Sequence, residues 1–525
     1  MATSNNPTQS IAVLKKQAED YGLQFLQNVD DCTFDHDMLE KLPVEWARDN
    51  AMLPVYLNDK PSLLTHDPDA IELHEYVSLL IGIELHPILA PEAVILDAIE
   101  QGYFKQDNSP SDFIDDLNHE EGAGKNMRAE VNDLLQVVSE APVTQLMNLI
   151  LLDAYKQNAS DIHIEPFENR LRVRYRIDGV MYEQSSPPAN MVQPLVSRLK
   201  VMAHMDIAER RLPQDGMARV KVGDRELDVR VSTVPVSEGE RVVLRLLDKK
   251  NILLSMADLG MSPSCNEQFC SLLNYSNGII VVSGPTGSGK TTTLYAALGE
   301  VDSSRKNILT IEDPVEYQLD NIGQIQVKPK IGLTFSNGLR HILRQDPDVI
   351  LVGETRDKET AEIAIRAALT GHLVFTTLHT NDAPSAVVRL IDMGIASYLI
   401  ASSLRGVLAQ RLVRKLCPAC NESHTLSPKE RALCGDYASL LADGDVRQAV
   451  GCPRCTDGYK GRIGIYELLT LTPDLRDVIR SSTFSLSDLR KHAADTGFKT
   501  LVEDGFTKVT QGITTIDEIL GASAV

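Results

Sequence analysis

A glycine-rich stretch near the middle of the chain has the residue types and spacing that bind phosphate. An apolar run, Ile279–Ser283, leads into it, and a helix-compatible segment, Leu294–Leu298, follows. Glycines let the backbone turn sharply and direct N–H groups at phosphate oxygens, while the start of the helix adds positive charge. Lys290 can reach the outer phosphates, and the Thr291 hydroxyl can ligate Mg²⁺. The predicted nucleoside triphosphate site comprises Gly284, Pro285, Thr286, Gly287, Ser288, Gly289, Lys290, Thr291 and Thr292.

Two further apolar runs end in side chains suited to a metal or a phosphate. Asp348–Val352 is followed by Gly353 and Glu354. The glycine-rich stretch above has the form of a phosphate-binding loop, or P-loop. In P-loop enzymes a strand that ends in an acid neighbours the strand that precedes the P-loop, so we expect Glu354 near Mg²⁺ and the γ-phosphate. The second run lies between His372 and His379, and a polar group just past it can sense the γ-phosphate by hydrogen bonding. A lone histidine or strand-end acid is more often structural, so these predictions depend on the P-loop.

A third strand end is rich in carboxylates. The segment Thr310–Glu316 carries Glu312, Asp313 and Glu316. Any of the three could orient water or support the metal, although an exposed loop carboxylate is the simpler interpretation of each alone. Strands at these positions alternate with helical segments, as in a parallel sheet. We therefore interpret this part of the chain as a RecA-like P-loop core of α/β class.

Two Cys-x₂-Cys pairs predict a metal site. Cys417 and Cys420 form the first pair, Cys452 and Cys455 form the second, and 31 residues separate the pairs (452 − 420 − 1). Two such hairpins can present four thiolates tetrahedrally, which suits Zn²⁺. Redox-active or incidental cysteines are the alternatives, but nothing else in the chain is thioredoxin-like. Four sulfur ligands leave no open position, so the predicted zinc is structural.

An arginine-bearing strand lies upstream of the P-loop. Leu171–Ile177 alternates apolar and charged residues, which predicts a half-buried strand with Arg172, Arg174 and Arg176 on one face. A solvated face is the commonest reason for such arginines. Three in register could also stabilise charge on a phosphate bound by a neighbouring domain.

Length and composition suggest about three domains. We expect a mixed α and β domain over residues 1–104, an acidic linker over 105–140, the arginine-bearing domain over 141–250 and the nucleotide domain over 251–525, with the cysteine insertion at about 414–462. The net charge of −21 opposes a general nucleic-acid binder. No apolar run is long enough to span a bilayer and no signal peptide is evident, so we expect a cytosolic protein.

From about Asp133 to the C-terminus, the order of motifs resembles the type II secretion ATPases, the GspE family of secretion and pilus motor ATPases. In these terms Thr310–Glu316 is similar to the Asp box, Asp348–Glu354 to an atypical Walker B strand, and Gly371–Asp382 to the His box. Pilus-retraction ATPases lack the paired cysteine motifs. The segments that carry the resemblance are Ser160–Pro166, Ala208–Gly216, Ser283–Thr291, Thr310–Glu316, Asp348–Glu354, Gly371–Asp382 and Arg389–Pro418.

The resemblance implies a RecA-like ATPase core with a zinc-binding insertion, preceded by a PAS-like α+β domain and a small N-terminal α+β domain. It implies ATP, Mg²⁺ and Zn²⁺ as ligands. Lys290, Glu316 and Glu354 would be catalytic, Thr291 and Glu354 would hold Mg²⁺, and His379 would contact the nucleotide.

The resemblance also implies that arginines of the second domain close over the phosphates, with Arg210 and Arg211 as candidates. The family usually has arginine directly after Pro-Gln-Asp-Gly. Here Met217 follows Gly216, and Arg219 comes two residues later. Which arginine of this loop faces the nucleotide is therefore open.

For assembly and partners, the resemblance implies a cytoplasmic hexamer that is peripheral on the inner membrane and attached to it only through partner proteins. Its N-terminal domain would dock on the cytoplasmic domain of an inner-membrane secretion protein, alongside a polytopic platform protein. ATP turnover would drive pseudopilus assembly and protein export. The alternatives are a type IV pilus assembly ATPase, a nucleic-acid translocase, which the negative charge opposes, and a nucleotide-gated scaffold with little turnover.

Overall fold

The computed structural model describes two compact units of the chain, Met1–Glu121 and Gly122–Val525, and each is considered by itself. The predicted acidic linker, residues 105–140, lies outside the described residues. The described residues are 14–18, 20–29, 32–42, 44–57, 60–104, 142–168, 170–222, 225–248, 254–256, 258–442, 444–481 and 484–523.

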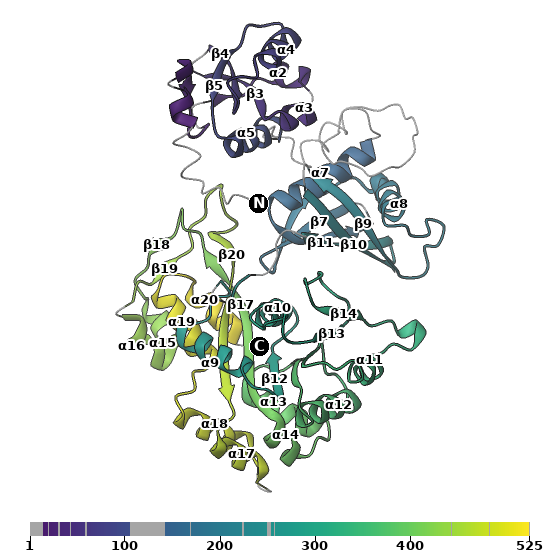
Figure 1. Ribbon diagram of the computed structural model, residues 1–525, viewed down its shortest axis with the longest axis vertical. Coiled ribbons are helices and arrows are strands. Elements are labelled where there is room, and N and C mark those ends of the chain that lie inside the picture. The colour runs from purple at the N-terminus through teal and green to yellow at the C-terminus, as the bar shows by residue number, and fades with distance from the viewer. Residues whose placement is uncertain are drawn as a thin grey trace. The chain divides into compact units, whose positions relative to one another are not determined.

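The first unit contains a mixed five-stranded sheet, ordered β1-β5-β4-β3-β2, with helices packed on it (Figure 1). Trp46 packs against the core of this unit, with its ring 5.3 Å from that of Tyr76. The elements are β1 (Gln24–Phe25), β2 (Cys32–Thr33), α2 (His36–Lys41), α3 (Val44–Asp49), β3 (Met52–Leu57), β4 (Lys60–Thr65), α4 (Ile71–Ile81), β5 (His86–Leu89) and α5 (Glu92–Phe104).

The second unit begins with an antiparallel sheet ordered β8-β7-β6-β11-β10-β9. Apolar residues of β7 are buried and its arginines are partly exposed, so the predicted alternation is confirmed. The elements are α7 (Pro142–Lys156), β6 (Ala159–Pro166), β7 (Leu171–Ile177), β8 (Val180–Ser185), α8 (Val192–Met202), β9 (Gln214–Val222), β10 (Arg225–Val236) and β11 (Gly239–Asp248).

A seven-stranded sheet, ordered β14-β13-β15-β16-β12-β17-β20, forms the core of the remaining residues. It is parallel from β14 to β17, whereas β20 is antiparallel to β17. The elements up to the last strand are α9 (Pro263–Leu273), β12 (Gly278–Ser283), α10 (Lys290–Gly299), β13 (Ile308–Glu312), β14 (Gly323–Gln326), α11 (Phe335–Ile342), β15 (Val349–Val352), α12 (Lys358–Leu369), β16 (Leu373–Leu378), α13 (Ala383–Asp392), α14 (Ser397–Ser403), β17 (Leu404–Leu416) and β20 (Tyr459–Thr470).

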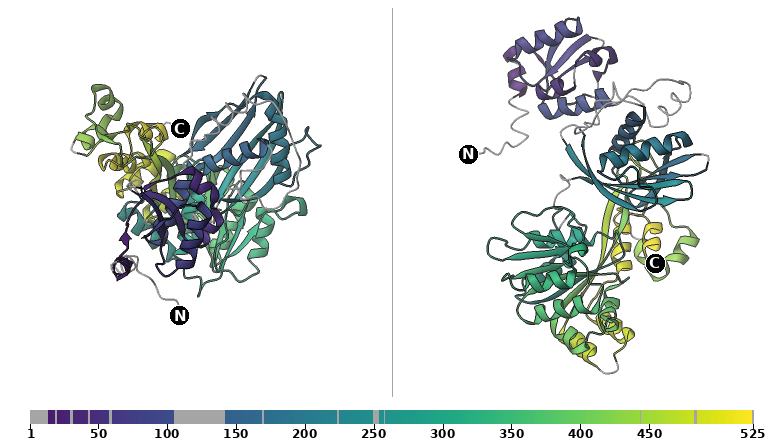
Figure 2. Two further views of the ribbon diagram at one scale, coloured as in Figure 1. Left: turned by 90° about the horizontal axis from the view of Figure 1, so that it is seen from above. Right: turned by 90° about the vertical axis from the view of Figure 1, so that its right-hand side faces the viewer.

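Helices cover both faces of this sheet (Figure 2). Ile279 and Val281 of β12 contribute to a core with α11, α12 and α13, while Ile280 and Val282 contribute to a core with α9 and α10. Burial on both faces explains why β12 is a continuous apolar run and does not alternate. The expectation that the Glu354 strand neighbours the P-loop strand is wrong, because β16 pairs with both β15 and β12 and lies between them.

The cysteine insertion separates β17 from β20, and a group of C-terminal helices follows β20. The insertion also contains a short helix, α15, which begins with a capping box at Ser427 and Glu430. The insertion contains β18 (Glu422–Ser423), α15 (Pro428–Cys434), α16 (Ala438–Ala442) and β19 (Arg447–Gln448), and the later helices are α17 (Pro473–Arg480), α18 (Leu486–Asp495), α19 (Leu501–Thr510) and α20 (Ile516–Ser523).

A buried ion pair stabilises the antiparallel sheet domain. Lys200 Nζ of α8 lies 2.5 Å from Glu240 Oε1 of β11 and donates to the Glu209 carbonyl oxygen at 2.7 Å. The two charged side chains are only 1% and 3% exposed. The same ammonium therefore fixes the backbone of the loop that carries Arg210 and Arg211.

Glu240→Ala should destabilise this domain by about 3–5 kcal/mol, because the Lys200 charge would stay buried without its partner. Hydrogen exchange of α8 at increasing urea concentrations measures the loss. Glu238→Ala, at an exposed position on the adjoining turn, is the control and should change little. Unaltered protection in the Glu240 variant would contradict the assignment.

Candidate functional site

The predicted phosphate-binding loop connects β12 to α10, so the strand–loop–helix context is confirmed. Gly284, Gly287 and Gly289 have φ angles of 149°, 80° and 84°, which residues with a Cβ rarely adopt. A Cβ on Gly284 would also lie 2.4 Å from the Gln410 carbonyl oxygen and 2.6 Å from Ser288 Oγ. The shape of the loop therefore requires glycine at position 284.

Lys290, the first residue of α10, reaches back over this loop. Its Nζ donates to the carbonyl oxygens of Gly284 and Pro285 at 2.7 and 2.9 Å. Burial lowers the pKa of Lys290, and the charge of Glu354 acts against that change. Hydrogen bonds to an anion are stronger than those to neutral carbonyls, so a phosphate could compete for this ammonium.

The structure brings two separately predicted residues, Glu354 and His379, into contact. Glu354 follows β15, and one of its carboxylate oxygens lies 2.9 Å from His379 Nε2. Its other oxygen lies 2.7 Å from Arg356. Partial burial acts to raise the pKa of Glu354, but the hydrogen bond and charge of Arg356, with the charges of His379 and Lys290, lower it below its usual range. The carboxylate is therefore anionic at neutral pH, as a Mg²⁺ site needs.

Polar residues that the sequence did not single out hold the loop in place. Gln410 of β17 donates from Nε2 to the Ser288 carbonyl oxygen at 2.6 Å. The hydroxyls of Ser283 and Thr380 lie 2.5 Å apart, which joins the end of β12 to the residue after His379. Gln410, Ser283 and Thr380 lie within segments that carry the resemblance, but no role was predicted for them, and only the pairing of β12 with β16 and β17 brings them together.

The three acids of the Thr310–Glu316 segment have different surroundings. Glu312 is buried at the end of β13, where Tyr295 and Thr310 each donate to it at 2.5 Å. Asp313 and Glu316 are exposed. Glu312 is therefore committed to internal hydrogen bonds, whereas the other two are accessible.

The arginines of β7 share one face, as predicted, but they are bound to carboxylates of β6. Arg172 and Arg174 donate to Glu165 at 2.8 and 2.6 Å, and Arg176 lies 3.8 Å from Asp161. The face is therefore largely a network of internal ion pairs.

The arginines of the loop before β9 are more exposed. The Arg211 guanidinium lies 3.0 Å from the Glu209 carboxylate and its side chain is 88% exposed, and Arg210 is also exposed. Both side chains are thus accessible to an anion from outside their own domain.

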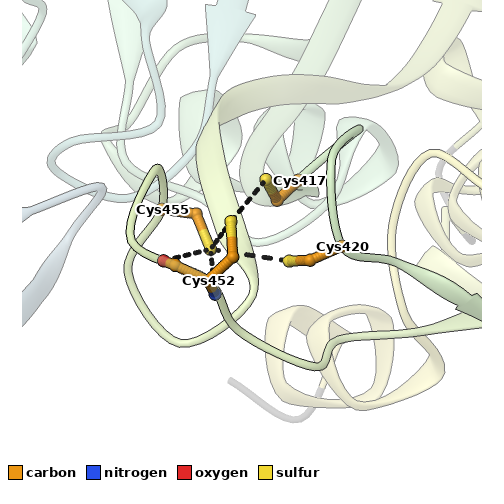
Figure 3. A group of neighbouring side chains, drawn as sticks. All are labelled: Cys417, Cys420, Cys452 and Cys455. Carbon is orange, nitrogen blue, oxygen red and sulfur yellow. Dashed lines mark hydrogen bonds between the residues drawn. The ribbon is translucent and has the colours of Figure 1, made fainter.

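The four predicted zinc ligands lie together at the base of the insertion (Figure 3). All four sulfur atoms are within 4.8 Å of one another. The sulfurs are 3.9 Å apart for Cys417 and Cys452 and 3.6 Å apart for Cys420 and Cys455. Zn–S bonds of about 2.3 Å at tetrahedral angles require sulfur separations of about 3.8 Å. The cluster therefore has the dimensions of a four-sulfur zinc site.

The parallel sheet, the glycine-dependent loop and the strand-end acid define a P-loop ATPase. Residues 136–521 match the type II/IV secretion system protein family, and residues 21–108 match the MshEN domain. The chain belongs to the type II/IV secretion system protein family and is an ATP-hydrolysing enzyme.

Named relatives fall into two groups. The type II secretion system protein E of Pseudomonas aeruginosa is 51% identical over 392 residues, covering 74% of this chain and 77% of the relative. The type IV pilus assembly ATPase PilB of Myxococcus xanthus is 42% identical over 513 residues, covering 97% of this chain and 90% of PilB. Among solved structures, the Legionella pneumophila ATPase DotB has a TM-score of 0.55 at 20% identity, and the match covers 72% of this chain and 95% of DotB. At this identity the likeness shows a shared fold alone.

Within the described ranges, every helix is too short or too polar to cross a lipid bilayer.

Gly284→Ala should weaken nucleotide binding at least tenfold, because the added methyl would collide with the Gln410 backbone at a strained φ angle. Fluorescence titration with an N-methylanthraniloyl nucleotide measures the affinity. Gly299→Ala, at the end of α10 with open space around its Cβ position, is the control and should bind normally. Normal affinity in both variants would show that the loop does not hold the phosphates in this shape.

Proposed function

We propose that the chain is the ATP-hydrolysing motor of a type II protein secretion system, which energises pseudopilus assembly and export of folded proteins across the outer membrane. The observation that carries the proposal is the 51% identity over 392 residues to a type II secretion protein E. A second candidate is a type IV pilus assembly ATPase. It is favoured by the match to PilB, which extends over 97% of this chain and so takes in the first unit.

For the chemistry, we propose that the P-loop holds Mg·ATP, with Lys290 on the outer phosphates and Thr291 and Glu354 supporting Mg²⁺. Glu316 would act as a second acid, and His379 would sense the γ-phosphate by hydrogen bonding. In support, Glu354 has a lowered pKa and lies 2.9 Å from His379, while Glu316 is exposed. The bound metal would supply charge stabilisation at the phosphates.

For coupling, we propose that the loop carrying Arg210 and Arg211 closes over the phosphates during turnover. Both arginines are exposed, whereas Arg172 and Arg174 already donate to Glu165. A guanidinium that approaches only in the closed state would stabilise transition-state charge. Each turnover would then change the angle between this domain, which we compare with PAS domains, and the ATPase core.

For assembly, we propose a cytoplasmic hexamer that is peripheral on the inner membrane. The first unit would dock on the cytoplasmic domain of an inner-membrane secretion protein, and the polytopic platform protein would be a second partner. The match of residues 21–108 to a separate domain family supports a distinct role for this unit. Exposed apolar side chains of α4, with Leu79 at 84% exposure, are suited to a docking contact.

Deletion of the gene distinguishes the two candidate functions. For a secretion motor, exported enzymes should accumulate in the periplasm while pili remain. For a pilus assembly ATPase, pili should be lost while secretion continues.

Complementation with Glu354→Gln should fail, because the amide lacks the negative charge. The purified variant should bind ATP but hydrolyse it at least a hundredfold more slowly. Normal turnover would refute the role of Glu354, and normal secretion and normal pili would refute both functions.

We also propose that Cys417, Cys420, Cys452 and Cys455 hold one structural Zn²⁺. Three of their sulfur separations are 3.6–3.9 Å and all are within 4.8 Å, which fits a tetrahedral ion. Four protein ligands complete its coordination, so the ion would hold the insertion together and take no part in hydrolysis.

Protein purified without added metal should contain about one zinc per chain by elemental analysis. Cys452→Ser should lower this content sharply, because oxygen is a poorer ligand than thiolate. Cys434→Ser provides a matched control, since Cys434 is a buried cysteine of the same insertion outside the cluster. Metal-free protein with four freely alkylated thiols would contradict the proposal.

A further inference from the structure

A buried polar cluster lies at the base of the acidic loop that carries Glu316. The Tyr295 hydroxyl of α10 donates to Glu312 Oε2 at 2.5 Å, and the Thr310 hydroxyl donates to Oε1 at 2.5 Å. Gln324 of β14 donates from Nε2 to the same Oε1 at 3.2 Å and approaches the Tyr295 hydroxyl at 3.3 Å. Tyr295 is fully buried and Glu312 is 4% exposed.

Gln324 also holds the loop itself. Its Oε1 accepts from the Leu319 backbone N–H at 2.7 Å, and its Nε2 lies 3.2 Å from the Tyr317 carbonyl oxygen. The Tyr317 ring meets the Tyr295 ring edge to face, with centroids 4.7 Å apart. One side chain thus binds the backbone just after Glu316 and the carboxylate beneath it.

Tyr295 acts as a hydrogen-bond donor within this cluster. Burial, and next the Glu312 carboxylate, raise the pKa of Tyr295. Its hydroxyl is therefore neutral and donates its proton to Glu312.

We propose that Gln324 and Tyr295 are positioning residues for Glu316. This inference rests on the proposed function, in which Glu316 is the second acid. The Glu316 side chain is exposed, so its location is set by the backbone contacts that Gln324 makes at Tyr317 and Leu319, just after it in the loop. Glu312 accepts hydrogen bonds on both oxygens and anchors the cluster without reaching solvent. An error of about 1 Å in the position of a reacting group can cost about a hundredfold in rate.

Gln324→Met keeps the side-chain length but removes its hydrogen bonds, and we expect kcat to fall about 10- to 100-fold. KM for ATP and the affinity for a fluorescent nucleotide should stay within about twofold, because Gln324 contacts the acidic loop and not the P-loop. Hydrogen exchange over residues 313–322 should accelerate. Gln326→Met, at an exposed position of the same strand, is the matched control and should retain normal kcat and exchange. Tyr295→Phe should also lower kcat, by a smaller factor than Gln324→Met.

A double-mutant cycle with Glu316→Gln separates this inference from the proposed function. If Gln324 acts through Glu316, Gln324→Met should have little further effect on kcat in the Glu316→Gln background. Normal kcat in Glu316→Gln alone would refute the catalytic role of Glu316. A slow Glu316→Gln enzyme with a normal Gln324→Met enzyme, or two effects that multiply fully, would overturn the positioning role while leaving that catalytic role intact. Equal losses of kcat and nucleotide affinity in Gln324→Met would also overturn it.

Discussion

The site depends on one constraint, namely that β13, β15, β16 and β12 are parallel and end at the same edge of the sheet. The P-loop, the acidic loop, Glu354 and His379 each follow one of these strands, so the same edge gathers them. The contact between Ser283 and Thr380 joins residues 97 positions apart, and Glu354 meets His379 in the same region. Without parallel pairing, the same motifs would be scattered over two edges.

Sequence patterns predicted the individual strands well, because a strand buried on both faces must be continuously apolar. They could not predict strand order, since an apolar run carries no information about its neighbours. The expected contact between β15 and β12 was wrong for this reason. In the site, glycine spacing indicated the P-loop, but Gln410 has no local signal. It holds Ser288 only because β17 pairs with β12.

The face of β7 that carries Arg172, Arg174 and Arg176 shows that sequence patterns also could not predict ion-pair partners. Alternation in β7 predicted which residues share a face, but the partners lie across the sheet on β6. Burial acts to raise the pKa of Glu165, but hydrogen bonds from Arg174 and Arg172 and the charge of Arg241 lower it. These contacts compensate for the cost of burying the carboxylate. They also occupy the guanidinium groups, whereas Arg210 and Arg211 of the loop before β9 are exposed. This difference supports the proposal that the loop before β9 supplies the arginines.

The position of the cysteine cluster limits what a metal there could do. Gln410 touches the P-loop, and Cys417 follows the end of the same strand. Seven residues of extended strand span about 23 Å, well beyond the roughly 8–10 Å over which exposed charges act at physiological salt. An exposed charge at the cluster would therefore act only weakly on the nucleotide. The Cys417 N–H donates to the Gly458 carbonyl oxygen at 2.8 Å, and Arg414 binds Glu518 at 2.7 Å. The cluster thus lies beside the paired ends of β17 and β20, and β17 contacts the P-loop nearer its middle.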